Sequence, residues 1–293
     1  MVSSKPVGNG VRQRNLGTYL NFLKIEHTLF ALPFAYGGML LAASGWPGWT
    51  KFFWISLAMV GARTASMALN RVLDAQIDGK NPRTAARAIP SGLLTKTDGI
   101  IVTGLGFTLL TVSAWSLNEL TLALLPIAIF FLAFYPLTKR WTWLCHFWLG
   151  LTIGAAAPAG WIAVTGSFSG IAIVLWIGVG FWVAGFDIIY SLLDKEFDIF
   201  EGIHSIPARF GTKKALFIAA LAHSCALGGL CLAIPIYGFG IPYTFSLVAI
   251  GLVLIYSHIV VRRGGTKAVV SSFGMNLAIS AIVLVGILME LLV

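Results

Sequence analysis

The sequence predicts an all-α protein that crosses a membrane several times. Hydrophobic residues make up 58% of the chain and charged residues 11%, whereas charged residues are about 25% of a typical soluble domain. The mean hydropathy is +0.88, and several apolar runs approach the roughly 20 residues that a membrane-spanning helix needs. The alternation typical of membrane-barrel strands is not seen. Helices are the expected form, because the bilayer core offers no water to backbone amides.

Nine apolar segments are long enough to cross a hydrocarbon core about 30 Å thick. They are residues 20–43, 52–73, 99–117, 120–137, 143–164, 170–192, 215–236, 241–261 and 268–292. We expect a polar cytosolic arm over residues 1–19 and one domain over residues 20–293, with nine transmembrane helices around a central cavity. Two longer loops, 74–98 and 193–214, contain glycine and proline and are expected to cap a site.

The basic residues predict the orientation of the chain. If the N-terminus is cytosolic, every lysine and arginine except Lys51 and Arg63 lies in a cytosolic segment or at its helix ends. This bias follows the positive-inside rule and predicts a C-terminus outside the inner or plasma membrane of the cell. The net charge of +9 therefore does not indicate nucleic-acid binding, because the positive charges are spread over short loops beside anionic lipid.

A polar motif ends the second apolar segment. Asn70, Asp74 and Asp78 are four residues apart, so a helix places their oxygen atoms on one face. Arg63 lies seven residues before Asn70 and continues this face into the membrane. Ionisable residues inside a membrane usually face a cavity or the bundle interior, where they need a partner. A purely structural pairing of Arg63 with Asn70 or Asp74 remains open.

A second acidic motif ends the sixth apolar segment. Asp187, Asp194 and Asp198 fall on one helical stripe, and Tyr190 lies on neighbouring surface. Both motifs end segments that run from outside to inside, so we expect them to surround one cavity near the cytosolic face. The five histidines are scattered, and the three cysteines have no metal-ligand spacing, so the carboxylates are the candidate ligands.

Two carboxylate pairs facing each other predict magnesium ions that hold a phosphorylated ligand. Mg²⁺ prefers carboxylate oxygens and usually keeps waters and substrate phosphate oxygens as its other ligands. Lys80, Arg83 and Arg87 follow the first motif and can neutralise the remaining phosphate charge. Positive-inside topology alone also explains Lys80, so its role stays open.

These motifs resemble the UbiA superfamily of intramembrane prenyltransferases. The resemblance rests on Asn70-x-x-x-Asp74-x-x-x-Asp78, Arg83-x-x-x-Arg87-Ala-Ile-Pro-Ser-Gly92 and Asp187-x-x-Tyr190-x-x-x-Asp194-x-x-x-Asp198, and it covers nearly the whole chain. Within the superfamily the chain is most similar to 4-hydroxybenzoate polyprenyltransferases, including Arg63 and the opening Lys24-x-Glu26-His27-Thr28. It departs at Gly202-Ile203-His204-Ser205, where many of those enzymes have lysine in place of His204.

The resemblance implies Mg²⁺-dependent transfer of a polyprenyl group from polyprenyl diphosphate to an aromatic acid, with 4-hydroxybenzoate as the expected acceptor, in quinone biosynthesis. It implies catalytic roles for Asp74, Asp78, Asp187, Asp194 and Asp198. It implies two Mg²⁺ ions bound by Asn70, Asp74, Asp78, Asp194 and Asp198. It implies substrate contacts from Arg63, Asn70, Lys80, Arg83, Arg87, Tyr190, His204 and Ser205. Arg63 is expected to bind the acceptor carboxylate, and Asp187 to orient its phenol or take up the ring proton.

Three alternatives remain open from the sequence. A neutral His204 supplies less positive charge than lysine, so another lipophilic-quinone precursor can be the acceptor instead. Haem is a further candidate acceptor, although a haem farnesyl transferase is not expected to carry the second acidic motif. An ion-coupled transporter also places Asp and Arg in the membrane, but near the midplane of discontinuous helices, whereas these acids lie at helix ends.

Overall fold

The computed structural model describes residues 15–23 and 31–293, and within these ranges every regular element is a helix. The helices are α1 (Leu16–Leu23), α2 (Leu32–Ala43), α3 (Trp49–Leu73), α4 (Ala75–Lys80), α5 (Lys96–Leu117), α6 (Glu119–Thr138), α7 (Cys145–Gly154), α8 (Ala156–Thr165), α9 (Gly170–Tyr190), α10 (Lys195–Glu201), α11 (Ile206–Tyr237), α12 (Ile241–Arg262) and α13 (Thr266–Leu291). A short 3-10 turn, Ser191–Leu193, follows α9. The predicted all-α class is confirmed. Most of the predicted arm, residues 1–14, and the Lys24-x-Glu26-His27-Thr28 motif lie outside the described residues.

Eight helical segments of the described chain are long and apolar enough to span a membrane. They are Trp49–Leu73, Lys96–Leu117, Glu119–Thr138, Cys145–Thr165, Gly170–Leu193, Ile206–Tyr237, Ile241–Arg262 and Thr266–Leu291. The segment predicted over 20–43 includes the end of α1 and the shorter apolar helix α2, and residues 24–30 between them lie outside the described part. The predicted count of nine is therefore not confirmed.

The segment predicted over residues 143–164 is divided into α7 and α8, which meet at Ala155. Pro158 explains this break, because proline has no amide hydrogen and its ring crowds the carbonyl of Gly154, four residues earlier. Together the two helices form one apolar segment, Cys145–Thr165, that is long enough to span a membrane.

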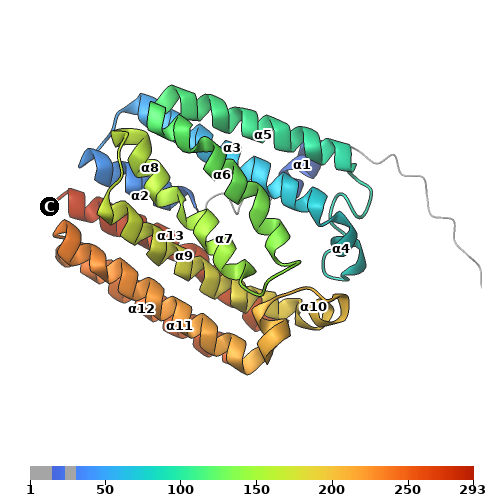
Figure 1. Ribbon diagram of the computed structural model, residues 1–293. Helices are drawn as coiled ribbons and strands as arrows, with labels where there is room; N and C mark the ends of the chain where they lie inside the picture. Colours follow the sequence, from blue (N-terminus) through green and yellow to red (C-terminus); the bar gives the residue numbers. More distant parts are fainter. Residues whose placement is uncertain (1–14, 24–30) are drawn as a thin grey trace, which may run out of the picture.

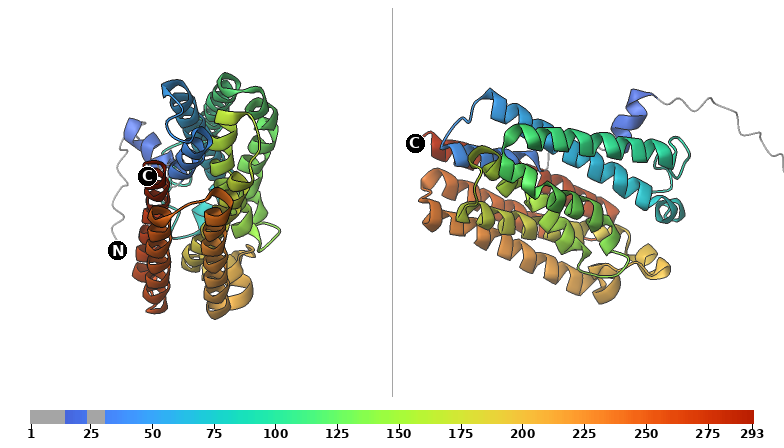
Figure 2. Two further views of the ribbon diagram at one scale, coloured as in Figure 1. Left: turned by 90° about the vertical axis from the view of Figure 1, so that its left-hand side faces the viewer. Right: turned by 45° about the horizontal axis from the view of Figure 1, so that its top comes forward.

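The long helices lie side by side in one bundle, and the two short helices α4 and α10 lie together at one end of it (Figure 1). The C-terminus lies at the opposite end, as the right-hand view of Figure 2 also shows. We call the end with α4 and α10 the acid end, because each of these helices follows one acidic motif. A buried core of α2, α9, α11 and α13 surrounds Trp182, whose indole nitrogen donates to Asn276 Oδ1 at 3.0 Å.

Helices α7 and α9 pack closely because glycine residues lie where they meet. A Cβ atom added at Gly150 of α7 would lie 2.2 Å from the carbonyl oxygen of Gly180 in α9. Small residues allow such close approach of helix backbones in membranes, where dispersion forces replace the hydrophobic effect as the driving force. This contact sets the position of α7 relative to the helix that carries the second acidic motif.

Gly150→Val should therefore lower the free energy of unfolding by about 1–3 kcal/mol, since the added side chain meets rigid backbone. Gly104→Val in α5 is the matched control, because a Cβ at Gly104 has no atom within 4 Å. Thermal unfolding of the purified protein in detergent measures both variants. Equal losses at the two positions would contradict the close α7–α9 contact.

Candidate active site

Both acidic motifs line one cavity at the acid end. The cavity has a volume of about 210 Å³, and its walls come from the ends of α3 and α9, from α4 and α10, and from the loop after α4. Its lining includes Asn70, Asp74, Asp78, Asn81, Arg83, Arg87, Lys139, Asp187, Tyr190, Asp194 and Asp198. The structure thus brings together the two motifs that the sequence analysis expected to meet.

Each motif crosses the junction between a long helix and a short one. Asp74 separates α3 from α4, with φ −91° and ψ 1°, and Asp194 separates the 3-10 turn from α10, with φ −106° and ψ 0°. The Asp78 amide donates to the Asp74 carbonyl at 2.8 Å, and the Asp198 amide donates to the Asp194 carbonyl at 2.7 Å. The two junctions have nearly the same backbone geometry, and both keep the helical spacing of the carboxylate pair.

Cations hold the first carboxylate pair. Lys139 Nζ lies 2.5 Å from Asp74 Oδ2, and Arg140 Nη2 lies 3.1 Å from Asp74 Oδ1. Arg87 Nη1 lies 2.7 Å from both carboxylate oxygens of Asp78. Asp74 is only 1% exposed and Asp78 5%, and carboxylates so far from water need such partners.

The loop after the first motif binds the second motif directly. Arg83 donates from Nε to Asp194 Oδ1 at 2.8 Å and from Nη2 to Asp194 Oδ2. Asn81 Nδ2 also donates to Asp194 Oδ1 at 2.8 Å, and Arg83 Nη1 lies 3.3 Å from the Tyr190 hydroxyl. A planar guanidinium bound by two hydrogen bonds fixes the relative position of the motifs.

Asp198 has no cationic partner like the one that Arg83 gives Asp194 among the described residues. Its Oδ2 accepts a hydrogen bond from Ser205 Oγ at 2.8 Å, and Ser205 also caps the start of α11. Burial and the negative charge of Asp194 raise the pKa of the Asp198 carboxyl to about 6, although the Ser205 hydrogen bond acts in the opposite direction. Carboxylates that oppose each other's ionisation are stabilised when a cation binds between them.

The oxygen donors around this cavity fit Mg²⁺ that shares its coordination with a ligand. In the described part of the chain, no three His, Cys, Asp or Glu side chains are close enough to hold a metal by themselves. Mg²⁺ rarely has such a protein-only site, because it usually takes one or two carboxylates and completes its shell with water and phosphate oxygens. The pairs Asp74 with Asp78 and Asp194 with Asp198 match that requirement.

Asp187 has a different kind of partner from the other acids. Its Oδ2 lies 2.7 Å from Nδ1 of His146, near the start of α7, and its side chain reaches the cavity. The other ring nitrogen, His146 Nε2, accepts a hydrogen bond from the Ile206 amide at 3.3 Å. His146 is only 2% exposed, so this ring is held between α7, α9 and the start of α11.

Four of the predicted substrate residues do not line the cavity: Arg63, Lys80, His204 and Ser205. Lys80 Nζ pairs with Glu201 Oε2 at 2.6 Å, and 62% of its side chain is exposed. The His204 amide donates to the Lys139 carbonyl at 2.8 Å, which ties the second loop to the end of α6. Ser205 contacts the site through its hydrogen bond to Asp198.

Arg63 lies outside the cavity lining as well, deeper in the bundle. It precedes Asn70 by seven residues, which is about 10 Å along a helix axis. Its buried Nε has no hydrogen-bond partner in the described part of the chain. A buried guanidinium with an unsatisfied donor is costly, so this position favours an anionic or polar ligand.

Four residues that contact the acids were not predicted from the sequence: Asn81, Lys139, Arg140 and His146. Lys139 and Arg140 follow an apolar segment, where positive-inside topology is a sufficient explanation for basic residues. His146 is far in sequence from Asp187, and no local spacing links the two. Only the packing of α6 and α7 against α3 and α9 brings these residues to the site.

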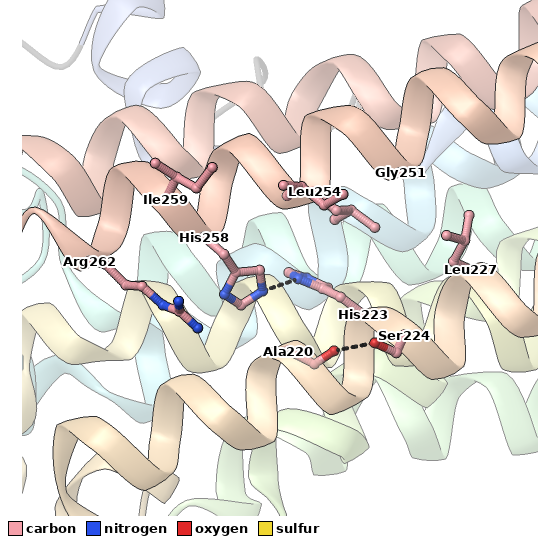
Figure 3. Close-up of a pocket in the computed structure, with 10 residues that line it drawn as sticks. Ala220, His223, Ser224, Leu227, Gly251, Leu254, His258, Ile259 and Arg262 are labelled. Carbon is pink, nitrogen blue, oxygen red and sulfur yellow. Dashed lines mark hydrogen bonds between the residues drawn. The ribbon is translucent and has the colours of Figure 1, made fainter.

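A second cavity of about 400 Å³ lies between α11 and α12 (Figure 3). Its polar lining residues are His223, Ser224, His258 and Arg262, and the rest are glycine or apolar residues. His223 Nδ1 and His258 Nε2 are 2.9 Å apart, so two histidines that are distant in the sequence form a pair. No carboxylate lines this cavity, so the smaller acidic cavity is the better candidate for a metal-bound anion.

The described helices define a polytopic helical membrane protein with an acidic cavity at one end. The sequence matches the UbiA prenyltransferase family over residues 31–280, and the chain belongs to that family. The resemblance inferred from its motifs is thereby confirmed.

Individual relatives agree with this assignment. The chain is 28% identical over 253 residues to a 4-hydroxybenzoate octaprenyltransferase from Vibrio campbellii, covering 85% of this chain and 88% of that protein. A UbiA homologue from Aeropyrum pernix K1, solved in its apo form, is 34% identical with a TM-score of 0.84, covering 91% of this chain and 98% of the other. A UbiA homologue from Archaeoglobus fulgidus, solved with GPP and Mg²⁺, shares the fold at 20% identity and a TM-score of 0.73, covering 94% and 100% of the two chains.

Proposed function

We propose that this protein transfers a polyprenyl group from polyprenyl diphosphate to an aromatic acid, with 4-hydroxybenzoate as the leading acceptor, in a Mg²⁺-dependent reaction of quinone biosynthesis. The observation that carries the proposal is the cavity where two carboxylate pairs meet four cationic side chains, Arg83, Arg87, Lys139 and Arg140. The name of the Vibrio relative and the ligands of the Archaeoglobus homologue support both substrates and the metal.

Bound Mg²⁺ would neutralise charge on the diphosphate leaving group. The residues that would hold it are Asn70 and the carboxylates of Asp74, Asp78, Asp194 and Asp198. The cations that pair with those carboxylates, Arg83, Arg87, Lys139 and Arg140, would contact phosphate oxygens when a diphosphate enters. Their positive charge would stabilise the negative charge that develops as the allylic carbon–oxygen bond breaks.

The second substrate would lie deeper than the diphosphate. The unsatisfied Nε of Arg63 supports its assignment as the group that binds the acceptor carboxylate. Asp187 lines the inner side of the same cavity and is the candidate to orient the phenol or take the ring proton. Tyr190 contacts Arg83 and would help to place that arginine on the diphosphate.

We also propose that the acid end faces the cytosol and the C-terminus faces the outside of the inner or plasma membrane. All described basic residues except Lys51 and Arg63 lie near the acid end by the sequence order of the helices, as the positive-inside rule requires. The diphosphate would enter from the cytosol, and the apolar prenyl chain would extend between helices toward lipid.

Arg63→Lys should raise KM for the aromatic acid about tenfold or more and leave KM for the prenyl diphosphate nearly unchanged. Lysine keeps the positive charge but cannot form the two parallel hydrogen bonds that a guanidinium gives a carboxylate. Initial rates at varied concentrations of each substrate measure the two constants. Equal effects on both would assign Arg63 to the diphosphate or to structural pairing instead.

A panel of acceptors tests the proposed reaction itself. Purified protein is incubated with labelled prenyl diphosphate, Mg²⁺ and 4-hydroxybenzoate, other aromatic precursors of lipophilic quinones, or haem, and products are identified by mass. Prenylated 4-hydroxybenzoate is the expected main product. If only another aromatic acid is prenylated, that acid is the acceptor in place of 4-hydroxybenzoate. If none of the acceptors is prenylated, the proposed function is contradicted.

A further inference from the structure

The contact between His146 and Asp187 has a defined hydrogen-bond direction. The Ile206 nitrogen is a backbone N–H and can only donate, so His146 Nε2 must accept with its lone pair. The ring proton then lies on Nδ1 and points to Asp187 Oδ2 at 2.7 Å. The two contacts thus match an imidazole that donates from Nδ1 to the Asp187 carboxylate and accepts at Nε2.

Asp187 is the acid of the cavity best suited to accept a proton. Asp74, Asp78 and Asp194 are bound by lysine or arginine, and Asp198 belongs to a proposed metal-binding pair. A permanent cation stabilises the charged form of a carboxylate and makes it a weaker base. Asp187 instead has an imidazole nitrogen, not a permanent cation, on Oδ2, and its Oδ1 has no hydrogen-bond partner in the described part of the chain.

We propose that His146 is a positioning residue that holds Asp187 with Oδ1 free, so that Asp187 is the base that takes the ring proton of the acceptor. This inference rests on the proposed prenyl transfer. The carbon–oxygen bond to the diphosphate breaks first, and its electrons leave with the diphosphate; the ring carbon then gives an electron pair to the allylic cation. The new carbon–carbon bond leaves a proton on that ring carbon. Asp187 Oδ1 takes this proton, the C–H electrons restore the aromatic ring, and Asp187 later passes the proton to water.

The surroundings of His146 keep this contact rigid. The α7–α9 approach at Gly150 and Gly180 fixes the helix that carries the ring, and the Ile206 amide at the start of α11 fixes its second nitrogen. Ile206 follows Ser205, which binds Asp198. The same segment therefore orients both the proposed base and one proposed metal ligand.

Two substitutions of His146 test whether its hydrogen bond to Asp187, and not the size of its side chain, supports the reaction. His146→Leu removes the donor, while His146→Gln can still donate its amide to Asp187 and accept from Ile206 through its oxygen. His146→Leu should lower kcat for aromatic prenylation about 10–100-fold, the effect expected for a residue that orients another. It should leave KM for prenyl diphosphate within about twofold and shift product toward free prenol, because ionisation continues while proton removal is impaired.

Three comparisons decide the assignment. His146→Gln should recover kcat to within about fivefold of wild type, since it supplies both hydrogen bonds. The double variant His146→Leu with Asp187→Asn should be no worse than Asp187→Asn alone, because the two residues act as one unit. His258→Leu, which removes a partner from the histidine pair in Figure 3, is the control for loss of a buried histidine contact and should keep normal kcat.

The possible outcomes are distinct. Full activity of His146→Leu, or His146→Gln as impaired as His146→Leu, would overturn the positioning role. If His146→Leu does not fold, His146→Gln and Asp187→Asn still decide: equal loss in both would overturn the positioning role. Wild-type protein that forms no prenylated aromatic acid would instead mean that the proposed function fails, independently of His146.

Discussion

Asp194→Asn should lower kcat/KM for prenyl transfer by about 10²–10³-fold, the effect seen when an electrostatic contact to the transition state is removed. Asparagine keeps the shape of the side chain but loses the negative charge that makes a carboxylate the preferred ligand of Mg²⁺. The change also leaves the Arg83 guanidinium without its carboxylate partner, although Arg83 can still bind phosphate oxygens. Steady-state rates at saturating Mg²⁺ measure the loss.

Glu196→Gln is the matched control for Asp194→Asn. Glu196 is two residues from Asp194, and 85% of its side chain is exposed. Its carboxylate pairs with Lys195. The same change of charge and shape at this position should alter kcat/KM less than about twofold, because exposed ion pairs contribute little. A similar loss in both variants would mean that the net charge of the acid end, and not the cavity, controls the rate.

Removal of divalent metal should abolish activity, and added Mg²⁺ should restore it. The carboxylate pairs of the cavity lack a closed set of protein ligands, so metal bound there shares its coordination with water and substrate and can be removed. The measurement is the rate of prenyl transfer in excess chelator, followed by titration with Mg²⁺. Full activity in excess chelator would contradict the metal assignment.

The sequence predicted the parts of the site that have local spacing. Asp74 and Asp78, and likewise Asp194 and Asp198, are one helical turn apart, and this spacing is visible in the sequence and kept in the structure. The expectation that both motifs surround one cavity followed from their exit on the same side of the membrane. Topology was sufficient for that inference, because helices that end on one face bring their ends to the same depth.

The long-range partners could not be predicted in the same way. Lys139 reaches Asp74, and His146 reaches Asp187, across helices that are far apart in sequence. These contacts depend on how closely helices approach, as at Gly150 and Gly180, and a single sequence contains no signal for that distance. The division of α7 from α8 and the short α2 likewise depend on local packing and proline geometry, which apolar periodicity does not show.

Both acidic motifs are proposed to hold one metal-bound diphosphate. The binding affinity for a non-reacting prenyl diphosphate analogue measures this without turnover. Calorimetry on wild type, Asp74→Asn, Asp194→Asn and Glu196→Gln, each with and without Mg²⁺, compares the affinities without turnover. The account predicts tight binding only with Mg²⁺, at least about tenfold weaker binding for either aspartate variant, and wild-type binding for Glu196→Gln. Binding of equal strength without Mg²⁺, or loss of affinity from only one of the two aspartates, would contradict it.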